Sequence, residues 1–173
     1  MVSIKNYYYL PKQFRKKHDY CEYLINQIEE LILDKTFIEL KTQEITFPKP
    51  FMKEVRKSKE NILDLLEKNN YHTELNNIVR TSMLLSLIME TCYFIQESLQ
   101  SSLKMRITVC FTLLRKPFLE ISILLMRILN EKDFIDKFNK VENFDPIKTT
   151  PEQKKILLKY TNNLIHINSK EED

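Results

Sequence analysis

The stretch ITVCFTLLRKPFLEISILLMRIL, residues 107–129, decides the fold because most of its residues are aliphatic, aromatic or cysteine. By length alone it could span a membrane. It also contains four charged residues, Arg115, Lys116, Glu120 and Arg127. A charge near the centre of a bilayer costs about 2.5–3.5 kcal/mol, so we expect no membrane contact. We predict instead that this stretch is the central helix of a helical bundle, covered on nearly all sides by neighbouring helices.

Pro117 lies inside this stretch and interrupts its helical hydrogen bonding. A proline has no N–H to donate to the carbonyl of Leu113, and its ring crowds that carbonyl, at a cost of about 3 kcal/mol in a continuous helix. The helix therefore either kinks just before Pro117 or restarts there. Arg115 and Lys116 lie at this break.

Composition excludes several classes of functional site. The 173-residue chain has no glycine, and P-loops, dinucleotide-binding fingerprints and nucleophile elbows all need glycine. Tight hairpin turns that need glycine are excluded as well, which disfavours a mostly β fold. The net charge of +3 is smaller than that of a strong nucleic-acid binder.

Cysteine and histidine positions predict neither a metal site nor a cofactor. Cys21, Cys92 and Cys110 are scattered and show no CxxC spacing, and the three histidines add no ligand pattern. Cys92 and Cys110 lie in apolar runs, so we expect them to be small core residues. The chain also begins without a signal peptide, and we predict a cytoplasmic protein.

Helical periodicity extends over most of the chain. Apolar residues recur at spacings of three and four in residues 20–33 and 51–69, and a long apolar helix follows that either turns at residues 101–105 or runs on. A last helix begins at Thr150-Pro151-Glu152-Gln153, which has the pattern of a helix cap. Residues 36–50 break the periodicity and predict a short extended arm.

These patterns predict one all-α domain over residues 1–173. Residues 1–50 would supply an N-terminal helix and the extended arm. Residues 51–168 would form the core of a four- to five-helix bundle.

A basic cluster opens the first predicted helix, at Lys12, Arg15, Lys16 and Lys17. It is either a solvated surface or a set of contacts to a nucleic-acid phosphate backbone. His18 and His72 lie in polar surroundings, so we expect both on the surface.

The charges of residues 107–129 can all be paired with carboxylates inside the bundle. The expected ion pairs are Lys116–Glu120, Arg127–Glu131, and Arg115 with either Glu90 or Glu97. The alternative is that Arg115 presents its guanidinium to a phosphate group in a cleft, for which its planar fork is suited. His166, which ends the last helix, is either a helix-terminal histidine stabilised by the helix dipole or a general acid–base.

The block LKMRITVCFTLLRKPFLEISILLMRIL, residues 103–129, together with LLKYTNNLIHINS, residues 157–169, resembles bacterial HEPN-like proteins. In one branch of that family a helix of the form L-L-R-x-x-x-E precedes a later helix that ends in histidine. The resemblance covers about residues 75–168. It implies an all-α bundle of four or five helices, often a homodimer. Many relatives are metal-independent ribonucleases of toxin–antitoxin, abortive-infection and CRISPR systems, and others are inactive binding or scaffold modules.

Two functional hypotheses follow. In the first, the chain is an RNA-directed effector of a bacterial defence or toxin system, in which the RNA 2′-OH attacks the adjacent phosphate. His166 would act as general acid–base, Arg115 would stabilise the phosphorane, and Glu120 completes the candidate catalytic set. The residues expected to bind RNA are Lys116, Lys12, Arg15 and Lys16.

The second hypothesis is a non-catalytic helical module that forms a homodimer or binds a partner protein through its apolar helices. The family's nuclease motif, an arginine followed after four to six residues by histidine on one helix, does not occur here, which favours this hypothesis. The first hypothesis requires Arg115 and His166 to converge in one cleft, within a chain or across a two-fold axis.

Overall fold

The computed structural model describes residues 6–38, 42 and 46–168, and the side chains of these except residues 37 and 164–168. The predicted all-α bundle is confirmed, and no strand occurs among the described residues. The elements are α1 (Lys12–Leu33), the 3-10 turn η1 (Lys35–Phe37), α3 (Lys49–Lys57), α4 (Ile62–Lys68), α5 (His72–Leu103), α6 (Ile107–Arg115), the π-helical segment η2 (Lys116–Ile121), α7 (Ser122–Asn130), α8 (Phe134–Lys140) and α9 (Pro151–Asn168).

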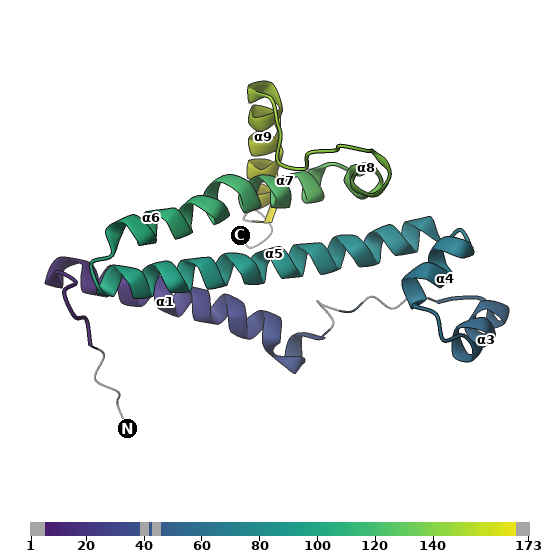
Figure 1. Ribbon diagram of the computed structural model, residues 1–173, viewed down its shortest axis with the longest axis horizontal. Coiled ribbons are helices and arrows are strands. Elements are labelled where there is room, and N and C mark those ends of the chain that lie inside the picture. Colours follow the sequence, from purple (N-terminus) through teal and green to yellow (C-terminus); the bar gives the residue numbers. More distant parts are fainter. Residues whose placement is uncertain (1–5, 39–41, 43–45, 169–173) are drawn as a thin grey trace.

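Helix α5 is the axis of the fold. Its 32 residues extend about 48 Å at 1.5 Å per residue. Figure 1 shows α1 along one side of α5 and the run α6–η2–α7 along another, with α3 and α4 near the start of α5. The expectation that residues 107–129 form the central helix is therefore wrong. An 18-residue window of α5 contains at most two charged side chains, whereas residues 107–129 contain four. Because burying a charged side chain is costly, neighbouring helices can enclose α5 on more of its sides than they can enclose residues 107–129.

The turn before α5 and the turn after it are both of a type that usually contains glycine. After α5, the N–H of Arg106 donates to the carbonyl of Ser101 at 3.1 Å, and Met105 takes the left-handed conformation with φ of 55°. Asn70, with φ of 61°, ends α4 in the same way. This is the hydrogen-bond pattern of a Schellman motif, in which glycine is the usual left-handed residue. The α5–α6 turn confirms the first of the two alternatives for residues 101–105.

Six of the buried residues form two clusters around the first half of α5. One joins α3 and α4 and consists of Phe51, Leu65 and Leu66. The other joins α7 and α8 and consists of Ile128, Phe134 and Ile135, packed against residues of α5 that include Val79, Met83 and Leu87. These contacts fix α7 and α8 on α5 and so determine where α9 can lie.

The cysteines follow the predicted pattern in part. Cys92 is 1% exposed, as expected for a core residue, and its burial raises the pKa of its thiol. Cys110 is only half-buried, and its sulfur lies 2.9 Å from the hydroxyl of Ser98 on α5. Cys21 is exposed.

Helical turns occupy both ends of the predicted extended arm, residues 36–50. The Asp34 carboxylate accepts a hydrogen bond from the N–H of Thr36 at 2.7 Å, which starts η1, and Pro50 lies in the first turn of α3. Residues 39–41 and 43–45 lie outside the described residues. The predicted extended arm is therefore wrong at its two ends, where a local cap and a proline favour helix.

Much of the apolar surface of α6 and η2 faces solvent. Helix α6 has no buried residue, Phe111 is 68% exposed, and Phe118 of η2 is 62% exposed. The inner side of α6 packs on α5, but no described element covers its outer side. The expectation that neighbouring helices cover this stretch within one chain is therefore wrong.

We predict that Phe134→Ala lowers the free energy of unfolding by about 3–5 kcal/mol, because Phe134 is fully buried and its loss leaves a cavity. Urea unfolding followed by circular dichroism measures the change. Phe14→Ala is the control, since Phe14 is 47% exposed on α1 and should shift stability by about 0.5 kcal/mol at most. Equal effects of the two substitutions would contradict this account of the core.

Candidate functional site

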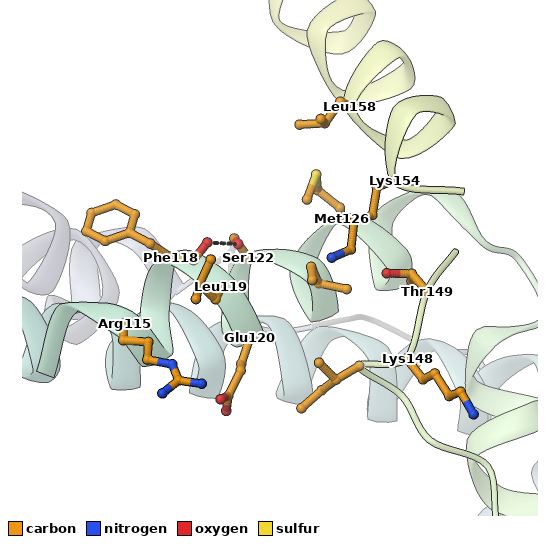
Figure 2. Close-up of a pocket in the computed structure, with 12 residues that line it drawn as sticks. Arg115, Phe118, Leu119, Glu120, Ser122, Met126, Lys148, Thr149, Lys154 and Leu158 are labelled. Carbon is orange, nitrogen blue, oxygen red and sulfur yellow. Dashed lines mark hydrogen bonds between the residues drawn. The ribbon is translucent and has the colours of Figure 1, made fainter. Parts of the chain in front are cut away.

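A groove of about 560 Å³ lies between η2–α7 and α9. Its lining comes from both sides and from the segment before α9, and comprises Arg115, Phe118, Leu119, Glu120, Ser122, Ile123, Met126, Ile147, Lys148, Thr149, Lys154 and Leu158. Figure 2 shows these side chains, with Arg115 and Glu120 extending in the same direction from the η2 region and Lys154 and Thr149 nearer α9. Two predicted site residues, Arg115 and Glu120, thus line one groove.

The π-helical segment places these residues. Pro117 cannot donate to Leu113, and the N–H of Ser122 instead donates to the carbonyl of Pro117, which widens the turn by one residue. The helix therefore neither stops nor restarts at Pro117, and a π turn absorbs the missing bond. Such single π turns occur frequently at functional sites. The Ser122 hydroxyl donates to the carbonyl of Phe118 at 2.8 Å, the dashed line in Figure 2.

The π turn also changes which charges meet. Lys116 pairs with Glu90 of α5 at 2.6 Å, and its ammonium lies 4.8 Å from the centre of the Phe94 ring. The predicted Lys116–Glu120 pair is therefore wrong. In a π turn, residues four apart no longer lie one above the other, so Glu120 is rotated away from Lys116.

Arg115 and Glu120 have no hydrogen bond or ion pair through their side chains within the described part of the chain. The predicted pairing of Arg115 with Glu90 or Glu97 is wrong, because Arg115 is exposed and Glu90 is taken by Lys116. The guanidinium is available to an external anion. The second interpretation of Arg115, an anion contact in a cleft, stays a prediction.

Arg127, by contrast, is 7% exposed and fully engaged. Its Nε and Nη2 donate to the Glu131 carboxylate at 2.8 and 3.1 Å, which confirms the predicted pair. Its Nη1 donates to the carbonyl of Pro146 at 2.7 Å and to that of Asp145 at 3.3 Å. These bonds hold the loop after α8 against α7, so the role of Arg127 is structural.

His166 belongs to helix α9, but its side chain lies outside the described residues. Its convergence with Arg115 therefore stays a prediction. The groove between the elements that carry the two residues is lined by Arg115 from the η2 side and by Lys154 and Leu158 from the α9 side.

The basic cluster of α1 is separate from this groove. Arg15 donates from Nε to the carbonyl of Leu10 at 3.1 Å, and its guanidinium lies 4.8 Å from the centre of the Tyr7 ring. Arg15 thereby holds the segment before α1. Lys12 and Lys16 are exposed at the start of α1, and neither lines the groove. Contact of these three residues with RNA stays a prediction.

His18 is buried, so its predicted place on the surface is wrong, whereas His72 is exposed as expected. The ring atom Nε2 of His18 lies 3.2 Å from the carbonyl oxygen of Leu99, which ties α1 to α5. The neighbouring Asp19 accepts a hydrogen bond from the Tyr7 hydroxyl at 2.5 Å, and this bond raises the pKa of Tyr7. Hydrophobic spacing gave no signal for His18, because its burial depends on where α5 lies.

His18, Asp19 and Glu22 form a trio in the described chain whose ligand atoms lie within 4.8 Å of one another. That spacing could suit a cation. Asp19 is already held by Tyr7 and His18 by Leu99, so the contacts of this trio join the N-terminal segment, α1 and α5.

Sequence reasoning missed the contribution of Lys148, Thr149 and Lys154 to the groove. The sequence feature that could have indicated this region was the predicted helix cap at Thr150. The N–H of Thr150 donates to Gln153 Oε1 at 2.8 Å, and the N–H of Gln153 donates to Thr150 Oγ1 at 3.2 Å. This capping box fixes the start of α9, but only the packing of α9 on α7 brings these three residues opposite Arg115.

By length and composition, α5 is the described helix that could cross a membrane. The same helix packs against α1, α4, α6, η2, α7 and α8. Its apolar character is therefore also what the axis of a bundle requires.

Comparisons with protein-family models, with curated proteins and with solved structures found no match for this chain. The resemblance to HEPN-like proteins therefore stays a prediction.

We predict that Arg127→Ala lowers the free energy of unfolding by about 3–5 kcal/mol, because it leaves Glu131 and two loop carbonyls without their donor. Arg127→Lys should recover only part of this loss, since an ammonium cannot reproduce the planar fork. Thermal and urea unfolding measure both. The exposed Arg106→Ala is the control, and a loss as large as that of Arg127→Ala would contradict the assignment.

Proposed function

We propose that the protein is a non-catalytic helical interaction module that associates with a second copy of itself through the outer side of α6 and η2. This outer side is defined by four exposed apolar residues, Ile107, Phe111, Phe118 and Leu119. The observation that carries the proposal is their exposure, which ranges from 45% to 68%.

The cost of this exposure supports the proposal. Apolar surface in water costs about 25 cal/mol for each Å² that burial would remove. Monomeric proteins rarely expose large contiguous apolar patches, and aromatic residues are enriched where proteins meet. Two phenylalanines, Phe111 and Phe118, are the most exposed members of this side.

Charge distribution favours a second copy as the occupant. Residues 107–114 contain no charged side chain, so two copies of α6 can meet along this stretch without like-charge repulsion when the exposed Arg115 and Lys116 lie at the edge of the contact. A two-fold axis presents the same apolar patch on both partners, and each patch supplies the chemistry that the other needs.

We predict that the Phe111→Ser/Phe118→Ser variant weakens self-association by about ten thousandfold or more, since each buried Phe contributes about 1.5–3 kcal/mol and the symmetry counts each change twice. Analytical ultracentrifugation over a concentration series measures the dissociation constant. The matched control is Phe14→Ser/Tyr23→Ser, which removes two exposed aromatics from α1. A monomeric native chain, or equal weakening in the control, would contradict the proposal.

A second candidate function is a metal-independent endoribonuclease of a bacterial defence or toxin system, as the HEPN-like resemblance implies. The position of Arg115 favours it, because an unpaired guanidinium in a groove with Lys148 and Lys154 suits a phosphate. In this mechanism the 2′-OH attacks the adjacent phosphorus and the bond from phosphorus to the 5′-oxygen breaks, while His166 would take the proton of the 2′-OH and supply one to the leaving 5′-oxygen.

We predict for this candidate that purified protein cleaves total RNA without added metal, and that Arg115→Ala and His166→Ala each lower the rate by about a hundredfold or more. Gel analysis of end-labelled RNA measures the rate. Arg106→Ala should cleave as the native chain does. Cleavage that is equal in all variants, or absent in the native chain, would remove the enzymatic candidate.

A further inference from the structure

We infer that the groove between η2–α7 and α9 binds an amphiphilic anion, a small molecule with an aliphatic tail and one oxyanion head such as a carboxylate or a phosphate monoester. This goes beyond self-association, which uses the outer side of α6 and η2. A volume of about 560 Å³ is within the range of small-molecule sites, roughly 300–1,000 Å³.

The tail would lie against the apolar part of the lining. Ile123, Met126 and Leu158 line the groove apart from the self-association surface, and Leu158 is 55% exposed, so the chain itself leaves its surface in water. Met126 lies between the two sides, and its flexible thioether adapts to tails of different shape. A bound aliphatic chain would cover these side chains, and removal of apolar surface from water drives such binding.

The head would be held by the cations of the same lining. Arg115, Lys148 and Lys154 contribute three positive charges, and Glu120 contributes the one carboxylate of the lining, so the groove has an excess of positive charge. Arg115 can donate two parallel hydrogen bonds to an oxyanion. A cationic head would find Glu120 but would also meet the three positive charges of the lining, and a neutral head would gain no ion pair.

Thr149 adds a donor that has no use in the free chain. Its Oγ1 is buried and has no hydrogen-bond partner among the described residues, although it lines the groove beside Lys154. A buried hydroxyl without a partner destabilises a protein, and valine would fill the same volume without that penalty. Rotation of the Thr149 side chain about χ1 would bring this hydroxyl from its buried position to an acceptor atom of the ligand.

The test uses the full-length chain and dodecanoate, below its micellar concentration, in isothermal titration calorimetry. Dodecyltrimethylammonium has the same tail and the opposite charge, and inorganic phosphate has a head without a tail. Dodecyl phosphate distinguishes the two kinds of oxyanion head, and vesicles of anionic phospholipid separate a groove ligand from a membrane surface. We expect saturable 1:1 binding of dodecanoate or dodecyl phosphate and at least about tenfold weaker binding of dodecyltrimethylammonium and phosphate. Equal binding of both charge types, no binding of either anion, or binding to vesicles alone would overturn the inference.

Variants locate the site. Lys148→Gln/Lys154→Gln should weaken dodecanoate binding about tenfold or more, while Lys155→Gln/Lys159→Gln, two exposed positions on α9 outside the lining, should not change it. Thr149→Val should weaken binding and at the same time raise the melting temperature of the free protein, a combination that simple unfolding cannot produce. Unchanged binding in both groove variants would overturn the assignment. Phe111→Ser tests self-association without touching the groove, so the two proposals can fail separately.

Discussion

The fold depends on the need to cover α5. This helix is apolar over much of its circumference, and a bare apolar helix of this length would be unstable in water. Helices α1, α4, α6, α7 and α8 pack directly on it. The two buried clusters lie along its first half, where α3, α4, α7 and α8 gather. The positions of these helices are therefore explained by the burial of the apolar surface of α5.

The burial of apolar surface is incomplete at α6 and η2, and two arginines of this region have different environments. Arg127 and Arg115 come from the same apolar stretch, yet Arg127 is enclosed by a carboxylate and two carbonyls, while Arg115 is exposed beside a groove. The first environment neutralises a buried charge, as stability requires. The second leaves a charge available for binding. One stretch of sequence thus contributes both to the core and to the candidate sites on the surface.

Local structure could be predicted from sequence, and the relations between distant helices could not. The Arg127–Glu131 pair and the Thr150 capping box depend on residues three or four apart, and both are observed. The burial of His18 depends on Leu99, 81 residues away, and the partner of Lys116 lies 26 residues away on α5. Helical spacing carries no information about such pairs. The pattern of apolar residues likewise does not distinguish a helix that is covered from one whose outer side stays open.

The π turn at Pro117 has a consequence for how this region can change by insertion and deletion. Each residue of an α-helix advances the chain by about 100°, and the π turn contains one residue more than an α turn. A π turn takes up its extra residue locally and leaves the helix on either side near the phase of an uninterrupted α-helix, so loss of one residue here would close the π turn into an α turn. Arg127 and Ile128 would keep their places in the interior, and α8 with its loop would keep its contacts with α7. The segment between α6 and α7 can therefore differ in length by one residue without displacing the helices that follow.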